Sequence, residues 1–149
     1  MAITAQHITK SFGDFKAVDD LNLRVRQGSV HGFLGPNGAG KTTVIRILLG
    51  LLVPDSAEIE ILGKDLFSSR NEIMSETGAV VEYPAFFDYM TAFENLYYLS
   101  RLSGNADKVM IDKAIDIVGL AKVRNKRVRE FSYGMKQRLG IAQAMIPDN

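Results

Sequence analysis

A glycine-rich run followed by a lysine and a threonine is the part of this chain best suited to chemistry. It reads Gly35-Pro36-Asn37-Gly38-Ala39-Gly40-Lys41-Thr42 and matches the pattern G-x-x-x-x-G-K-[ST]. Glycines let successive backbone N–H groups turn toward one anion without strain. Lys41 would lie over the β- and γ-phosphates of a nucleoside triphosphate, and Thr42 would offer its hydroxyl to Mg²⁺. The run therefore predicts a nucleotide site that extends from Gly35 to Thr43, with a chance glycine-rich turn as the alternative.

A second glycine-containing motif stands near the end of the chain. It reads Phe131-Ser132-Tyr133-Gly134-Met135-Lys136-Gln137-Arg138 and is followed by a run of small and apolar residues. Ser132 can N-cap a helix that starts here. Its hydroxyl and the amide of Gly134 would then lie at the positive end of that helix, where a γ-phosphate is favoured. An ordinary capped helix is the alternative interpretation.

Strand patterns dominate up to residue 82, and helix patterns dominate after it. Alternating or continuous apolar residues predict strands over residues 3–8, 21–25, 30–34, 58–62 and 78–82. Apolar spacing and caps predict helices over residues 42–49, 68–76, 91–102, 107–118 and 133–146, the third with a capping box of Thr91 and Glu94. The glycine-rich run thus stands between a strand and a helix N-terminus. We expect a β-rich core over residues 1–84 and a helical subdomain over residues 85–149.

The composition is that of an ordinary globular domain. Apolar residues make up 46% and charged residues 23% of the 149, and the formal net charge is +1. This balance gives no global field that would attract nucleic acid, so we expect no nucleic-acid partner. The chain has no cysteine, which excludes disulfides and thiol catalysis within it. Its longest apolar run, residues 47–53, is too short to span a bilayer. The basic run at residues 122–129 favours a solvated connector, with a phosphate or partner surface as the alternative.

A phosphate-binding loop alone leaves kinases, GTPases, helicases and transport ATPases open. The motif at residues 131–138 resembles the signature motif of ATP-binding-cassette (ABC) ATPases, which usually reads Leu-Ser-Gly-Gly-Gln. The resemblance covers essentially all 149 residues and implies an α/β P-loop NTPase core with an N-terminal antiparallel β region and a helical subdomain. It implies ATP and Mg²⁺ as ligands. It also implies that Ser132, Tyr133, Gly134 and Met135 act on the ATP held by a partner copy.

Two further positions gain a role from this resemblance. Phe12, in Lys10-Ser11-Phe12-Gly13, resembles the aromatic residue that stacks on adenine; a strand-end aromatic is the alternative. Glu82 stands where the family usually places a glutamine near Mg²⁺ and the γ-phosphate. We expect it to be a metal-site and catalytic residue beside Lys41, with a surface carboxylate as the alternative. His7 and His31 do not stand where the family's switch histidine falls, and both are expected in strands.

The glutamate and the residues around it resemble exporters of the bacitracin- and lantibiotic-resistance type. Such a subunit would pair with a second nucleotide-binding domain, identical or different, and with a transmembrane permease subunit. It would lie at the cytoplasmic face of the membrane, and residues 84–102 would meet the permease. The aromatic residues Phe86, Phe87, Tyr89 and Phe93 suit such a surface, and packing in the core is the alternative for them. The family's Asp-Glu strand has no match before Asn149, so we expect a fragment that lacks the C-terminal half of the core. A binding module without turnover and a soluble, non-transport ABC ATPase are the alternatives.

Overall fold

The computed structural model describes residues 1–81, 85–102 and 107–146. The chain divides into two compact units, Met1–Ile73 (unit 1) and Met74–Asn149 (unit 2). Each unit is described by itself below. The functional boundary expected between residues 84 and 85 stays a prediction.

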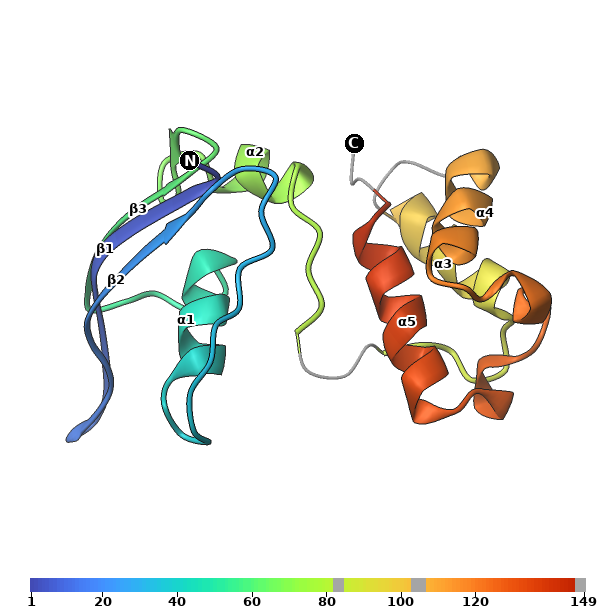
Figure 1. Ribbon diagram of the computed structural model, residues 1–149, viewed down its shortest axis with the longest axis horizontal. Coiled ribbons are helices and arrows are strands. Elements are labelled where there is room, and N and C mark those ends of the chain that lie inside the picture. The colour runs from blue at the N-terminus through green and yellow to red at the C-terminus, as the bar shows by residue number, and fades with distance from the viewer. Residues whose placement is uncertain (82–84, 103–106, 147–149) are drawn as a thin grey trace. The chain divides into compact units, whose positions relative to one another are not determined.

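Unit 1 is built on a four-stranded antiparallel sheet. The strands are β1 (Ile3–Phe12), β2 (Phe15–Val25), β3 (Ser56–Ile61) and β4 (Lys64–Asp65), in the order β2-β1-β3-β4 (Figure 1). The predicted N-terminal antiparallel β region is confirmed. The first two strands are longer than expected because the polar residues after Ile8 continue β1 into a tight hairpin with β2. Gly13 makes this turn with a φ of 57°, which side chains other than hydrogen disfavour.

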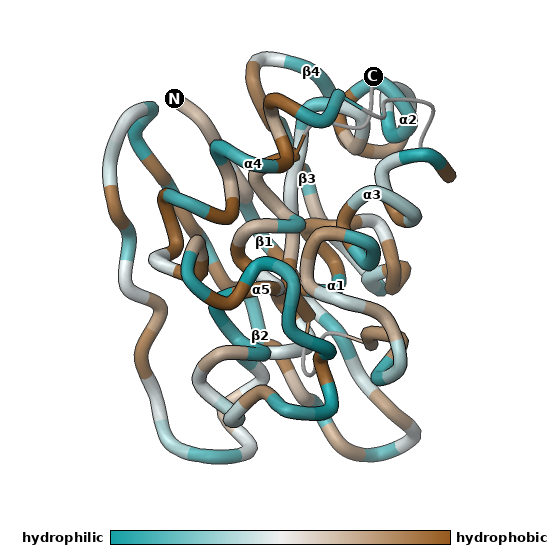
Figure 2. The backbone as a smooth tube through the Cα atoms, turned by 90° about the vertical axis from the view of Figure 1, so that its right-hand side faces the viewer, coloured by the Kyte–Doolittle hydropathy of each residue, from teal (hydrophilic) through white to brown (hydrophobic). Residues whose placement is uncertain are grey.

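Apolar side chains on one side of this sheet are buried together with one face of a helix. Helix α1 (Lys41–Leu48) lies beside the sheet (Figure 1) and buries Val44 and Ile47. Strands β1 and β3 bury Ile8 and Ile59. Hydrophobic and hydrophilic residues alternate along the backbone, as Figure 2 shows, and this alternation is what allows each element to bury one face only. A short helix, α2 (Arg70–Ser75), begins in this unit, and its last two residues belong to unit 2.

Unit 2 is helical. It contains α3 (Ala92–Leu102), α4 (Lys108–Ile117) and α5 (Tyr133–Ala144), with short 3₁₀ turns η1 (Ala121–Val123) and η2 (Val128–Glu130) between the last two. The three helices share one apolar core, to which each contributes fully buried side chains. The core residues are Ala92, Leu96, Ile111, Ala114, Ile115, Leu120, Val128, Phe131, Leu139, Ala142 and Ile146. The predicted helical subdomain is confirmed as a structural element.

Two of these helices begin at the caps that the sequence predicts. At α3, Glu94 N–H donates to Thr91 Oγ1 (3.1 Å) and Thr91 N–H donates to Glu94 Oε2 (2.8 Å), which is a capping box. At α5, Met135 N–H donates to Ser132 Oγ (3.3 Å). The caps satisfy backbone donors that have no partner inside the helix.

Replacing Glu94 by alanine should lower the melting temperature at neutral pH, and this loss should vanish in acid. The backbone N–H of Thr91 lowers the pKa of the Glu94 carboxyl because it stabilises the charged form. A carboxyl whose pKa is lower in the folded state stabilises the fold above its unfolded pKa, and this contribution is lost as the pH falls through the folded value. Melting curves of both proteins at pH 7 and at about pH 2, well below the ordinary glutamate pKa of about 4.3, test this. A difference that stayed constant across this range would contradict it.

Two predicted strands are wrong. Residues 29–36 have no regular structure, and Val30 and Leu34 are almost fully exposed; His31, expected in a strand, is exposed too. Residues 77–81 also form no strand. A strand requires a neighbour for its backbone hydrogen bonds, and within the described residues neither segment has one. His7 does lie in β1, where its Nδ1 is 2.6 Å from Asp20 Oδ1.

Candidate nucleotide-binding site

The glycine-rich run forms a loop that ends at the first residue of α1. Gly38 and Gly40 have φ angles of 84° and 76°, in the left-handed region that favours glycine. Gly40 also packs tightly on β2, since a Cβ there would lie 2.3 Å from the carbonyl oxygen of Ala17. The sequence pattern therefore corresponds to a real backbone requirement, and it fixes the loop against the sheet.

The lysine that follows the loop folds back over it. Lys41 Nζ donates to the carbonyl oxygens of Gly35 and Pro36, each at 2.6 Å. Thr42 is exposed, and the first turn of α1 has no acidic side chain to neutralise the positive end of the helix. An ammonium group, an exposed hydroxyl and a helix N-terminus free of acid are the groups that suit a triphosphate with its Mg²⁺. The residues of the loop therefore fit that ligand.

Phe12 lies at the tip of the β1–β2 hairpin in the same unit. Its ring is half exposed, and it pairs across the turn with Phe15, which is also exposed. Val18, farther along β2, packs close to Gly40: a Cβ added to this glycine would lie 3.1 Å from Cγ2 of Val18. Strand β2 thus connects the two features: it forms one arm of the hairpin that carries the aromatic ring, and the glycine-rich loop packs against it.

The hairpin has a polar anchor that the sequence did not reveal. Asp55 accepts hydrogen bonds from the Ser11 N–H (2.6 Å) and from Lys10 Nζ (3.1 Å). Lys10 Nζ is also 5.6 Å from the centroid of the Phe12 ring. No signal in the sequence pointed to Asp55, because it stands far along the chain from the residues it contacts.

The second motif lies in unit 2, at the start of α5. Ser132 caps the helix, Gly134 is exposed, and the Tyr133 hydroxyl accepts a hydrogen bond from Gln137 Nε2 (3.1 Å). Met135 packs partly buried against the core of the unit. The predicted cap is therefore confirmed, and Gly134 and most of Tyr133 face outward.

Two basic residues behind this motif hold α5 in place. Lys136 Nζ contacts Asp88 Oδ1 at 2.9 Å. Arg138 Nη1 donates to the carbonyl oxygens of Val118 and Gly119 at the end of α4 (3.2 and 3.3 Å). Cations suit the end of a helix, where carbonyl oxygens lack partners. In the sequence, Arg138 stands out only as part of the signature motif; the structure shows that it holds the end of α4.

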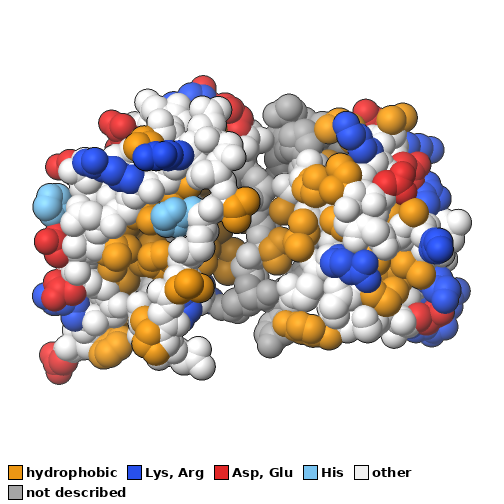
Figure 3. Space-filling model, in the orientation of Figure 1, with side chains coloured by type: hydrophobic (Ala, Val, Ile, Leu, Met, Phe, Trp, Pro, Cys, Tyr) orange, Lys and Arg blue, Asp and Glu red, His pale blue; other side chains and the backbone are white. Residues whose placement is uncertain are grey.

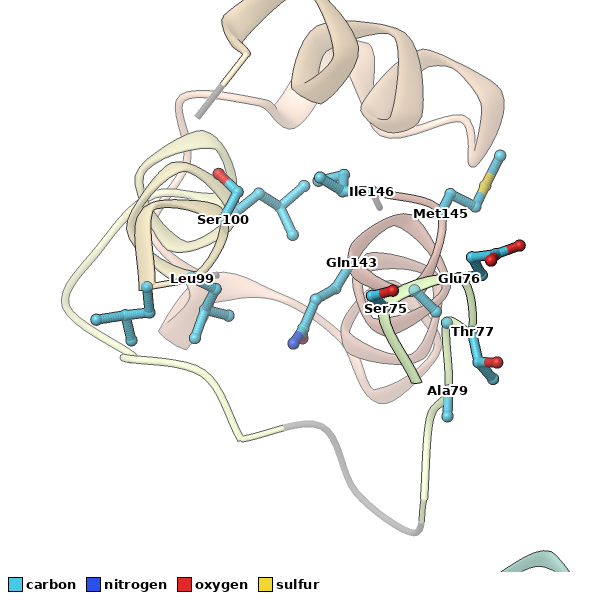
Figure 4. A pocket seen from close by; sticks show the side chains of 13 residues that line it. Ser75, Glu76, Thr77, Ala79, Leu99, Ser100, Gln143, Met145 and Ile146 are labelled. Atoms are coloured by element: carbon cyan, nitrogen blue, oxygen red, sulfur yellow. The ribbon is translucent and has the colours of Figure 1, made fainter. Parts of the chain in front are cut away.

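The predicted residues thus fall into two groups, one in each unit, and one residue lies outside them. Unit 1 contains Phe12 and the run from Gly35 to Thr43, and unit 2 contains the run from Ser132 to Met135. Glu82 lies outside the described residues. A separate cavity of about 370 Å³ in unit 2 lies between residues 75–79 and the ends of α3 and α5 (Figure 4). None of the described residues predicted to bind nucleotide lines it.

The sequence profile described as "ABC transporter" matches residues 18–149. The chain therefore belongs to the ABC transporter family, and the expected α/β ABC ATPase fold is confirmed. It is 49% identical over 144 residues to the bacitracin transport ATP-binding protein BcrA of Bacillus licheniformis, covering 97% of this chain and 47% of that protein. It is 37% identical to the daunorubicin resistance ATP-binding protein DrrA3 of Streptomyces coeruleorubidus, covering 99% of this chain and 48% of that protein.

Solved structures agree on the fold. The structure of cbiO1 from Clostridium perfringens, part of the ABC transporter complex cbiONQ, superposes with a TM-score of 0.81 at 24% identity, covering 97% of this chain and 61% of that one. The chain spans about half the length of the curated relatives it matches. Among the described residues, no helix combines the length and the apolar character that crossing a membrane requires. Hydrophobic side chains do reach the surface of both units (Figure 3).

Proposed function

We propose that the protein to which this chain belongs is the ATP-binding subunit of an ABC exporter that removes an antibiotic of the bacitracin or lantibiotic kind. The main support is the glycine-rich loop, whose left-handed glycines and folded-back lysine fit a triphosphate. Identity to BcrA and DrrA3 supports the export of an antibiotic, because both names state transport or resistance.

Each predicted site residue has a place in this proposal. Backbone N–H groups between Gly35 and Thr43 surround the phosphates, Lys41 neutralises them, and Thr42 helps hold Mg²⁺. The metal, when bound, neutralises charge that develops on the phosphate oxygens. Phe12 stacks on the adenine ring, and Glu82 lies beside the metal as a residue of the catalytic machinery.

Two nucleotide-binding domains, identical or different, would act together. In this arrangement Ser132 and Gly134 of one copy cover the ATP held by the loop of the other, and ATP binds more tightly to the closed pair than to the open one. That difference in affinity drives the permease subunit. Exposed aromatic rings suit the contact with the permease: Phe87 lies 5.8 Å from Tyr89 and 5.3 Å from Tyr98, centroid to centroid. The subunit would then lie at the cytoplasmic face of the membrane.

Removing the two key side chains of the loop should separate their roles. In the full-length subunit, Lys41→Ala should weaken ATP binding about tenfold to a hundredfold, because a charge-assisted contact to phosphate contributes roughly 1.5–3 kcal/mol. Thr42→Ala should lower the affinity for ATP measured with Mg²⁺ more than the affinity measured without it. Calorimetric titration with ATP, with and without Mg²⁺, measures both effects.

Lys16→Ala serves as the control, because Lys16 is an exposed lysine of β2 paired only with Asp19 in the described contacts. If Lys41→Ala and Lys16→Ala bound ATP equally well, the assignment of the loop would fail.

Phosphate release by the subunit with its permease distinguishes an ATPase from a module that only binds nucleotide. In the same assay, an unchanged rate for Glu82→Gln would remove the role proposed for its charge.

A further inference from the structure

The hairpin that carries Phe12 extends beyond the sheet on one side. Within the described residues, β3 pairs with β1 only as far as Thr9, which faces Ser56, whereas β1 continues to Phe12 against β2 alone. A two-stranded hairpin without further support is marginally stable in water. Residues 10–16 therefore need an anchor on the β3 side if Phe12 is to keep one position.

Asp55, the residue before β3, supplies that anchor with both its backbone and its side chain. Its N–H donates to the carbonyl oxygen of Thr9 (2.9 Å), which continues the strand pairing by one bond. Its Oδ2 then accepts the N–H of Ser11 (2.6 Å). One carboxylate thus occupies the place that a longer β3 would otherwise take beside Ser11.

The second carboxylate oxygen controls the surroundings of the aromatic ring. Asp55 Oδ1 contacts Lys10 Nζ (3.1 Å), and the Lys10 side chain is only 17% exposed. Lys10 and Phe12 project to the same side of β1, since side chains two positions apart share a face. The ammonium group lies 5.6 Å from the ring centroid, within the range of a cation–π attraction. Hydrogen bonds from Lys10 and from the Ser11 N–H lower the pKa of the Asp55 carboxyl, so it is charged at neutral pH.

We propose that Asp55 is a positioning residue, which holds the Lys10–Phe12 end of β1 so that the Phe12 ring is ready to stack on the base of the nucleotide. The proposal rests on the proposed function, in which Phe12 contacts adenine. This role needs only the contacts of Asp55 with Lys10 and Ser11, and no contact of its own with the nucleotide. Its removal lets the hairpin adopt other positions, and the apparent affinity for a ligand falls in proportion to the fraction of molecules that remain competent.

The test compares a ligand that has a base with one that has only phosphates. In the full-length subunit, Asp55→Ala should lower the affinity for a non-hydrolysable ATP analogue by at least about threefold, as a competent fraction of one third would. The affinity for inorganic tripolyphosphate, which needs only the glycine-rich loop, should not change. Calorimetric titration with both ligands gives the ratio of the two affinities.

Asp65→Ala is the control. Asp65 is another exposed aspartate of unit 1 whose carboxylate accepts hydrogen bonds from the N–H (2.9 Å) and hydroxyl (2.8 Å) of one nearby serine, Ser68. It lies in β4, which pairs with β3 and not with the hairpin. This variant should leave the ratio of affinities unchanged, even if it lowers the melting temperature.

Phe12→Ala separates failure of this proposal from failure of its premise. It should lower the affinity for the ATP analogue by roughly tenfold, as loss of a stacked ring does. If it does so while Asp55→Ala leaves both ligands unaffected, or weakens both equally, the positioning role is wrong and Phe12 keeps its function. If Phe12→Ala itself leaves the affinity for the ATP analogue unchanged, the stacking role is wrong and the positioning proposal falls with it.

Discussion

Replacing Gly40 by alanine is expected to destabilise unit 1 and to abolish nucleotide binding by the full-length subunit. The φ of 76° at this position costs an alanine about 1–2 kcal/mol. The added Cβ would in addition lie 2.3 Å from the carbonyl oxygen of Ala17 and 3.1 Å from Cγ2 of Val18. Ala17 lies between Lys16 and Val18, which both pair with β1, so the strand is held on either side of this carbonyl and the loop must move instead. We expect a total loss of stability of about 3 kcal/mol or more.

Gly38→Ala is the matched control for this prediction. Gly38 lies in the same loop with a similar φ of 84°, but a Cβ there would meet no atom within 4 Å. Gly38→Ala should be destabilised only by the cost of placing an alanine at a positive φ, without a clash of its Cβ. Its melting temperature should therefore lie between those of the wild type and Gly40→Ala. Thermal unfolding and calorimetric titration with ATP measure the two variants side by side. If Gly38→Ala and Gly40→Ala had the same melting temperature, the packing of Gly40 on β2 would not constrain the loop.

Replacing Asn95 by alanine is expected to have the largest effect on the helical unit. Asn95 is fully buried, and its amide makes three hydrogen bonds to backbone groups. Oδ1 accepts the N–H of Phe87 (2.8 Å), and Nδ2 donates to the carbonyl oxygens of Phe87 (3.0 Å) and Thr91 (2.9 Å). Alanine would leave these groups without the side-chain partner. The two carbonyl oxygens keep backbone donors, the N–H of Met90 and the N–H of residue 95 itself, so the Phe87 N–H is the group that loses its partner. A buried polar group without a partner costs about 1–3 kcal/mol, and we expect a loss of that size.

The midpoint of urea unfolding of the full-length protein measures this loss. Ser100→Ala is the control, because Ser100 is also buried in α3. Among the described residues, its hydroxyl donates only to the carbonyl oxygen of Tyr97 within the same helix (3.1 Å). If Asn95→Ala cost no more than Ser100→Ala, the hydrogen bonds to Phe87 would not be holding the segment before α3. The segment matters because Phe87 and Tyr89 belong to the aromatic surface proposed to meet the permease.

Local patterns allowed the sequence to predict a large part of this protein. The glycine-rich loop, the Thr91–Glu94 capping box and the Ser132 cap each depend on residues a few positions apart. Their geometry is therefore determined by neighbouring backbone atoms, and a short pattern is enough to predict it. The antiparallel region and the helices of unit 2 follow from apolar periodicity in the same way. The roles of Phe12, Glu82 and the Ser132–Met135 run in binding nucleotide stay predictions.

Tertiary structure alone decided the features that join distant parts of the chain. Residues 30–34 have an apolar strand pattern, yet they are not a strand because pairing needs a neighbour that no local pattern supplies. Asp55 beside Ser11, and Lys136 beside Asp88, are contacts between segments separated by more than forty residues. Asn95 is fully buried, although asparagine is a residue type found mostly on protein surfaces, so its type alone would not predict its burial. Short-range patterns thus determined the phosphate-binding loop and the helix ends, whereas the packing of the whole chain determined what anchors them, because hydrogen bonds and burial depend on atoms that the fold alone brings together.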